Sequence, residues 1–258
     1  FLRHAPDPNH PWRRMEANGA VLRGTWGVHN SFHKLAPGSS RSDGWFWVGI
    51  GRGVVKRVFL TEAPIDTLSL AVLDRRRQQS NQATIYLSTD GCGGVPKEEL
   101  QRVLDQGGQV IVAFDADQAG EMAAWRVAEQ LPGVRRVTPA VGKDWNERLL
   151  AEGKSAEQFS KGEATPRSRG DPDKQTLKSL WRWHQTAHAI GKSPQYLARI
   201  TEVAREFVKG EPLSDKAKAA MQHDFQEGRG RVRFQVNLKS AGSIRTRQKP
   251  ISSMEIGG

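Results

Sequence analysis

Three carboxylates stand directly after two apolar segments of the chain. Glu62 follows residues 58–61, and Asp115 and Asp117 follow residues 110–114. Clustered carboxylates repel one another unless a cation lies among them, and oxygen ligands favour Mg²⁺ or Mn²⁺ over zinc. An Asp-x-Asp pair alone is a weak signal, but its position after a buried strand, with a glutamate after an earlier strand, is much more specific. The pattern predicts a divalent-metal site built from these three residues.

The elements that carry these residues alternate between strand and helix. We expect strands over 57–61, 84–88, 109–114 and 134–140, and helices over 64–77, 96–106 and 119–131. This order predicts an α/β fold in which a parallel four-stranded sheet has helices on both faces. Right-handed crossovers place the carboxyl ends of the strands at one edge, where open parallel sheets bind their ligands. The three acids should therefore meet there although they are far apart in sequence.

The regions on either side of the sheet have a different composition. Short strand candidates at 19–25, 31–36 and 44–50 predict a small antiparallel β unit within residues 1–56, with Trp45, Phe46 and Trp47 partly in its core. After a linker at 165–172, helices are expected over 173–190, 194–209 and 213–227, each closed by a glycine. The basic stretch 229–249 reads as either a β-hairpin or a disordered arm. The predicted domains are 1–56, 57–164 and 165–258, the last helical with a basic tail.

The charge is unevenly distributed along the chain. The protein has 258 residues and a net charge of +11, which divides into +5 for residues 1–56, −3 for 57–164 and +9 for 165–258. Basic flanks suit a polyanionic partner, because each neutralised phosphate releases counterions. A merely solubilising surface charge is the alternative. The acidic centre fits carboxylates gathered around a hard cation.

Several protein classes are excluded by composition. The single cysteine, Cys92, rules out an internal disulfide framework and a zinc ribbon within these residues. No window approaches the 18 apolar residues of a membrane span. We therefore expect a cytoplasmic protein, or a piece of a longer one.

Three segments in order along the chain resemble the successive motifs of a Toprim domain. They are residues 62–66, 114–120 and 142–147, so that the resemblance covers roughly residues 57–150. Similar domains occur in bacterial replicative primases, in type IA and type II topoisomerases and in overcoming-lysogenisation-type nucleases. The glycine-rich turn 90–94 is similar to that of the primase-like subgroup. Residues 1–56 are similar to the small β region that precedes the Toprim domain in primase-like proteins of plasmids and mobile elements.

The resemblance implies a Mg²⁺-dependent (or Mn²⁺-dependent) nucleic-acid site. Asp115 and Asp117 would be metal ligands, Glu62 a ligand or general acid–base, Asp144 a secondary ligand and Lys143 a phosphate contact. The basic stretch near the C-terminus adds further candidate phosphate contacts, which are Arg229, Arg231, Arg233, Arg245 and Arg247.

The implied function is primer synthesis on a single-stranded DNA template from nucleotides, in a plasmid or mobile-element replication system with a helicase or relaxase as possible partner. A Toprim nuclease and a non-catalytic DNA-binding module of a larger protein remain alternatives. Two departures from the family matter: no zinc ribbon is possible here, and neither Tyr86 nor Tyr196 is placed for strand transesterification. The second departure disfavours a topoisomerase.

Other motifs favour ordinary structural roles. Residues 49–53 suggest a dinucleotide loop, but a strand follows instead of a helix, so that a turn is expected. His184 and His188 share one helix face without the glutamate of a zincin. Trp145, Trp181 and Trp183 are expected to pack in the interior.

Overall fold

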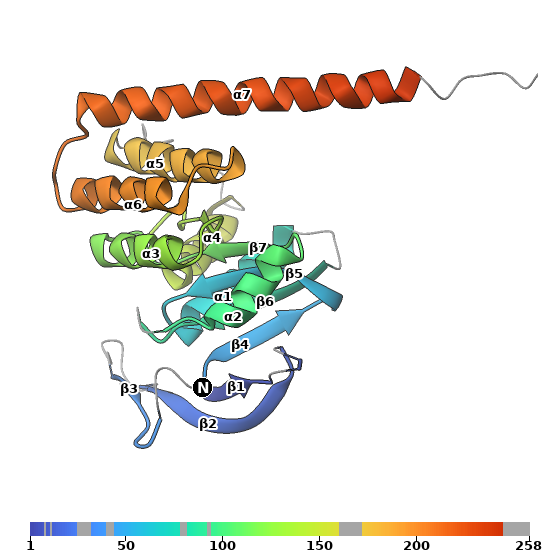
Figure 1. Cartoon of the computed structure of the whole chain (residues 1–258). Helices are drawn as coiled ribbons and strands as arrows, with labels where there is room; N and C mark the ends of the chain where they lie inside the picture. Colours follow the sequence, from blue (N-terminus) through green and yellow to red (C-terminus); the bar gives the residue numbers. More distant parts are fainter. Residues whose placement is uncertain are drawn as a thin grey trace, which may run out of the picture.

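The computed structural model describes residues 1–7, 9–10, 12–24, 32–39, 44–77, 82–91, 94–159 and 172–244. Figure 1 shows three parts arranged one above another, in chain order. A small β-sheet formed near the N-terminus lies at one end, an α/β unit is in the middle, and the C-terminal helices form the other end.

The central sheet contains five strands in the described part of the chain. They are β4 (Phe46–Ile50), β5 (Arg52–Thr61), β6 (Gln82–Ser88), β7 (Gln109–Val112) and β8 (Arg135–Arg136). Their order is β4-β6-β5-β7-β8, with β5 to β8 parallel and β4 antiparallel to β6. The carboxyl ends of β5 and β7 are neighbours, because β5 pairs directly with β7.

Helices cover both faces of this sheet, as predicted. They are α1 (Pro64–Arg77), α2 (Lys97–Asp105), α3 (Gln118–Gln130) and α4 (Trp145–Phe159). Along β5, Val58 and Leu60 belong to the apolar cluster shared with α2 and α3, whereas Phe59 belongs to the cluster shared with α1 and α4. This alternation follows from the two-residue period of a strand. Full burial of a side chain such as that of Leu60 contributes about 1.5–3 kcal/mol.

The third predicted strand of the N-terminal unit belongs to the central sheet instead. We predicted residues 44–50 as part of the small antiparallel unit, but β4 pairs with β6 from Phe46–Ser88 to Ile50–Thr84. The sheet therefore has five strands and not four, with an antiparallel strand at its edge. The pattern of apolar residues identified the strand correctly, but it carries no information about which distant strand becomes its partner.

The end of the central unit also differs from the prediction. The strand expected over 134–140 is only two residues long, because the chain leaves the sheet after Arg136 with one more bond, from Val137 N to Val112 O at 3.0 Å. Helix α4 was not predicted. The remaining strands and helices of this unit lie within two residues of their predicted bounds, except that β5 begins at Arg52, five residues before its predicted start.

The N-terminal sheet consists of β1 (Leu2–Pro6), β2 (Arg14–Arg23) and β3 (His33–Leu35), all antiparallel. The predicted strands at 19–25 and 31–36 correspond to parts of β2 and β3. A bridge between His4 and Trp45 links β1 to the chain just before β4. This small sheet is thus tied by hydrogen bonds to the edge of the central sheet.

The C-terminal helices are α5 (Pro172–Ala189), α6 (Pro194–Val208) and α7 (Asp215–Ile244). Helix α6 packs on α3, and α5 packs between α6 and α7 (Figure 1). We predicted that Gly228 ends the last helix and that 229–249 forms a hairpin or an arm. The helix instead runs through Gly228 to Ile244. Gly228 stands where α7 approaches α5 closely, since a Cβ on it would lie 2.7 Å from Thr186 Cγ2.

Some predicted features lie outside the described residues. These are the boundary between residues 164 and 165, most of the linker 165–172, Cys92 in the glycine-rich turn, and the basic residues beyond Ile244. Of the helices in the described ranges, none combines the length and the apolarity that crossing a bilayer requires.

Candidate metal and phosphate site

Glu62 and Asp115 meet at the carboxyl edge of the central sheet. Glu62 follows β5 and Asp115 lies three residues beyond β7, the strand beside it. The backbone N–H of Asp115 donates a hydrogen bond of 3.1 Å to Glu62 Oε1. The parallel pairing of the strands therefore brings together two residues that are far apart in the sequence, as the strand order predicted.

Asp117 caps the first turn of α3. Its backbone is extended, and its side chain accepts a hydrogen bond of 2.8 Å from Gly120 N, which is the usual role of an aspartate at this position. Gly120 allows the helix to approach the acids closely. A Cβ on it would lie 2.5 Å from Asp115 O and 2.7 Å from Glu62 Oε1. A larger residue at position 120 would therefore force the loop and Glu62 apart.

Lys143 lies over the two aspartates. Its Nζ is 2.9 Å from Asp117 Oδ2 and 4.0 Å from Asp115 Oδ2, and its side chain is 56% exposed. A backbone bond of 2.8 Å from Ala116 N to Lys143 O fixes the Lys143 segment beside the aspartate loop. The hydrogen bond to Asp117 raises the pKa of Lys143, so that the ammonium remains charged.

Asp144 caps α4, and its carboxylate lies close enough to the other acids to affect their pKa values. Its Oδ1 accepts a bond of 2.7 Å from Glu147 N, and Glu147 Oε2 accepts one of 2.7 Å from Lys143 N. This pattern is similar to a capping box, except that Glu147 accepts from the N–H of the residue before the cap and not from that of the cap. The negative charge of Asp144 also contributes to the raised pKa values of Asp66 and Asp115.

Asp66 is a member of the acidic group to which the sequence reasoning assigned no role. It lies in the first turn of α1, is 5% exposed and accepts a bond of 3.3 Å from Asn146 N. Burial and the negative charge of Asp144 raise its pKa to about 6. The spacing of Glu62 and Asp66, four residues apart at the junction of a strand and a helix, was the available signal.

The pKa values of these acids show how strongly the carboxylates interact. Burial, followed by the negative charges of Glu62, Asp66 and Asp144, raises the pKa of Asp115 to about 7. Burial also raises the pKa of Glu62. Burial alone would raise the pKa of Asp117, but the N–H of Gly120 and the Lys143 ammonium outweigh it and lower that pKa. The site therefore concentrates negative charge without enough positive charge to balance it.

The acids of this group offer oxygen atoms, which are the ligands that Mg²⁺ and Mn²⁺ prefer. Asp115 Oδ1 is buried and has no hydrogen-bond donor among the described residues, which is unusual for a carboxylate oxygen. Glu62, Asp115 and Asp117 do not come within 4.8 Å of one another as a set of ligand atoms. Lys143 is paired with the two aspartates, and because its side chain is mostly exposed it can move aside for a cation.

A second acidic group on α7 has a different character. Ligand atoms of His223, Asp224 and Glu227 lie within 4.8 Å of one another. The two carboxylates already have cationic partners. Lys192 Nζ lies 3.3 Å from Asp224 and 2.9 Å from Glu227, and Arg231 Nη2 lies 3.3 Å from Glu227. We therefore interpret this group as an ion-pair cluster that links α7 to the loop before α6.

The predicted basic contacts near the C-terminus lie apart from the acids. Arg229 and Arg231 are exposed on α7, and α5 and α6 separate that helix from the central sheet (Figure 1). Arg233 is also in α7, but its side chain is not described, and Arg245 and Arg247 lie outside the described residues. The structure thus brings Glu62, Asp115, Asp117, Lys143 and Asp144 together at one edge, without these arginines.

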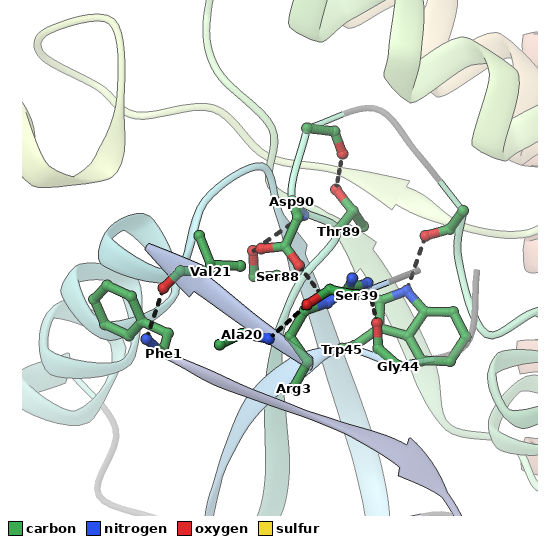
Figure 2. Close-up of polar contacts among 12 residues, drawn as sticks. Phe1, Arg3, Ala20, Val21, Ser39, Gly44, Trp45, Ser88, Thr89 and Asp90 are labelled. Carbon is green, nitrogen blue, oxygen red and sulfur yellow. Dashed lines mark hydrogen bonds and ion pairs between the residues drawn. The ribbon is translucent and has the colours of Figure 1, made fainter. Parts of the chain in front are cut away.

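The loop that follows β6 holds the backbone at Glu62 by hydrogen bonds. Gly91 N donates a bond of 2.7 Å to Glu62 O, and Thr89 N donates one of 2.9 Å to Thr61 O. Asp90 lies between them and pairs with Arg3 of the N-terminal sheet (Figure 2). This buried ion pair was not predicted, because no local pattern indicates that β1 lies beside the end of β6.

The remaining sequence candidates have the structural roles that we expected. Tyr86 is buried in β6, and Trp145, Trp181 and Trp183 are all nearly buried. His184 is fully buried, against Trp125 and Trp181.

The central part of the chain matches a known family. Residues 59–149 match the family described as Toprim-like. This match confirms the resemblance drawn from the three motifs, and the central unit has a Toprim fold. The matched residues include Glu62, Asp66, Asp115, Asp117, Lys143 and Asp144.

Two solved structures from bacteriophage T7 are similar to the chain. The primase fragment of the primase-helicase protein is 21% identical with a TM-score of 0.38, over 62% of this chain and 61% of that fragment. A structure of the lagging-strand DNA polymerase interacting with primase domains bound to an RNA/DNA hybrid and dTTP gives 20% identity and a TM-score of 0.29, over 53% and 67%. The chain spans about three fifths of the T7 primase fragment. No curated protein matches it.

Proposed function

We propose that this protein is a Mg²⁺- or Mn²⁺-dependent nucleotidyltransferase of the primase type, acting on a single-stranded DNA template. The observation that carries the proposal is the meeting of Glu62 with the Asp115 loop inside a Toprim-like domain, where Asp115 Oδ1 is buried and has no donor among the residues that the structure describes. In such a reaction a hydroxyl attacks the α-phosphorus of a nucleotide and pyrophosphate leaves.

Asp115 and Asp117 are the proposed metal ligands, with Glu62 as a ligand or general acid–base and Asp144 as a secondary ligand. A bound divalent ion would neutralise the charge that develops on the phosphate oxygens. Burial raises the pKa of Glu62, which favours its protonated form relative to an exposed glutamate and suits a general acid–base. Lys143, exposed beside the two aspartates, is the proposed phosphate contact.

Template binding is assigned to the basic surface of the C-terminal region. Arg229 and Arg231 are exposed on α7, and residues 165–258 carry a net charge of +9. Exposed guanidinium groups bind the phosphate backbone without regard to sequence. We propose a plasmid or mobile-element replication system as the setting, with a helicase or relaxase as partner and a cytoplasmic location.

The test is incubation of the protein with single-stranded template, nucleotides and Mg²⁺ or Mn²⁺. New primers support the proposal, whereas a shortened template indicates a Toprim nuclease, which needs the same acids. A mobility shift without either product indicates a non-catalytic DNA-binding module.

The site assignment is tested with a matched pair of variants. Asp115→Asn with Asp117→Asn should abolish synthesis, whereas Asp105→Asn with Asp215→Asn makes the same change of charge at exposed acids outside the site and should leave it intact. Synthesis that survives the first pair would show that the acidic group is not the active site.

A further inference from the structure

We propose that Arg136 is a positioning residue for the acidic site, and that Trp181 of α5 makes the C-terminal helices part of its support. The proposal rests on the proposed function, since it assigns residues that hold the Asp115 loop. Its basis is a continuous set of buried contacts from α5, through α3 and β8, to the backbone of Asp115.

Arg136 binds the main chain of the loop that carries the acids. Its Nη2 donates to Asp115 O at 2.7 Å, and its Nη1 donates to Phe114 O at 2.8 Å and to Val137 O at 2.8 Å. The side chain is 4% exposed. A guanidinium group has five N–H donors in a fixed plane, so that it can hold several carbonyls in a defined arrangement. Arg136 thereby fixes the carbonyls of Phe114 and Asp115, which belong to the two peptide groups on either side of the Asp115 Cα.

Glu121 fixes the orientation of Arg136. Arg136 Nε lies 3.0 Å from Glu121 Oε2, and the glutamate side chain is 8% exposed. The other carboxylate oxygen, Oε1, accepts a hydrogen bond of 2.5 Å from Trp181 Nε1. Both oxygens of this buried carboxylate therefore have a donor, one from the central sheet and one from α5.

Trp181 reaches Glu121 because its ring is stacked on Trp125 of α3, with the ring centroids 3.8 Å apart. Without the indole N–H, Glu121 Oε1 would be a buried charged oxygen without its donor, which is costly. The carboxylate would then turn toward another donor or toward water, and Arg136 would lose its fixed partner. The Phe114 and Asp115 carbonyls would then no longer be held in one arrangement.

The experiment compares Trp181→Phe with Trp183→Phe in the full chain. Each removes one buried indole N–H from α5, but Trp183 donates to Asp224 of α7, at 2.7 Å, and not toward the acidic site. Two quantities are measured: hydrogen–deuterium exchange of a peptide covering residues 112–120 without metal, and the Kd for Mn²⁺. Thermal unfolding of both variants checks that they lose similar stability.

We expect Trp181→Phe to speed exchange in the 112–120 peptide several-fold and to weaken Mn²⁺ binding about 10-fold, as removal of supporting groups around metal ligands does. Trp183→Phe should change neither. Unchanged exchange in Trp181→Phe, or equal changes in both variants, would overturn the proposal. If Trp181→Phe does not fold, Glu121→Gln keeps an acceptor for the indole and removes the ion pair to Arg136, with the same expected results.

The two proposals fail in different ways. If the wild-type protein does not bind Mn²⁺ through Asp115, the proposed function fails, whereas the exchange comparison still decides whether Trp181 holds the loop. If Mn²⁺ binds and supports synthesis but the exchange rates are equal in the two variants, the positioning role alone is wrong.

Discussion

Arg3 Nε lies 2.8 Å from Asp90 Oδ2, and both side chains are about 1% exposed. The pair joins β1 to the loop that follows β6 (Figure 2). In that loop Gly91 N donates a hydrogen bond to Glu62 O. Asp90 also has φ at +52°, in the left-handed region that costs a non-glycine residue energy. The ion pair and the bond from Ser88 Oγ to Asp90 Oδ1 stabilise this conformation. The N-terminal sheet therefore helps to hold the backbone of Glu62.

Removal of one partner from this buried pair should destabilise the protein strongly. We expect Arg3→Met to lower the free energy of unfolding by about 3–5 kcal/mol, because it leaves Asp90 charged in a buried place. Arg77→Met breaks an ion pair to Glu152 in which Arg77 is 60% exposed, and should cost less than about 1 kcal/mol. Urea unfolding of the two variants measures the difference, and equal losses would contradict it.

Asp115→Asn should stabilise the metal-free protein at high pH. The pKa of Asp115 is raised to about 7 in the folded protein, above its value in the unfolded chain. Ionisation of Asp115 therefore lowers the free energy of unfolding. This loss is absent below the unfolded pKa and grows as the pH rises toward 7. At pH 8 we expect a gain of about 1–3 kcal/mol in the variant, and at pH 4 no gain. Denaturant unfolding without metal at both pH values gives the comparison. A loss of stability at pH 8 would show that the charge of Asp115 is already compensated.

The buried His184 should make the protein sensitive to acid. Burial lowers its pKa to about 4, with a further contribution from His188, and neither ring nitrogen has a partner in the described part of the chain. The pKa of this histidine in the unfolded chain is near 6.5. The free energy of unfolding therefore has its full value above pH 6.5 and falls by on the order of 3 kcal/mol as the pH drops toward 4. His184→Leu should lose less stability than the wild type between pH 6.5 and 4. If the free energy of unfolding depends on pH in the same way in the variant and in the wild type, His184 is not the group that causes the loss of stability in acid.

Two glycines of α7 should respond in opposite ways to alanine. A Cβ on Gly228 would lie 2.7 Å from Thr186 Cγ2, whereas one on Gly230 would meet nothing within 4 Å. Gly230→Ala should therefore stabilise the helix by about 0.5–1 kcal/mol. Gly228→Ala should destabilise the protein by about 1 kcal/mol or more because the packing against α5 is overfilled. Thermal unfolding of both variants tests the close contact between α5 and α7.

Neutralisation of α7 should weaken DNA binding in a salt-dependent way. With Arg229→Gln and Arg231→Gln together, we expect lower affinity for single-stranded DNA of any sequence. The slope of log K against log salt concentration should fall by about 1–2, because fewer phosphates are neutralised. Titration at several salt concentrations measures this slope. If it does not change, the template binds on another surface.

Much of the central unit could be predicted from local patterns. The run 109–114 and the helical spacing of 64–77 gave β7 and α1 nearly to their bounds. The meeting of Glu62 with the Asp115 loop followed from the rule that parallel strands end at one edge. Strand order was thus enough to predict this meeting, because the relevant residues stand at strand ends.

The features that were missed depend on contacts between distant segments. Asp90 and Arg3 show no pattern that pairs them, and Arg136 stands in a segment that was expected to be an ordinary strand. Gly228 was interpreted as a helix end because glycine often follows a helix, but here it permits close packing. In each case the tertiary partner, and not the local sequence, determines the role of the residue.

The arrangement of the sheet edges affects how copies of this protein can associate. Just before β4 the chain is bridged to β1 through His4 and Trp45, and at the other edge β8 is only two residues long. Long rows of free backbone groups are what allow strands to join across chains. Among the described residues, the β8 edge has only two residues for such pairing, whereas β4 is paired over five residues on one side only, with β6. Any pairing of strands between copies of this protein should therefore use β4 and not β8.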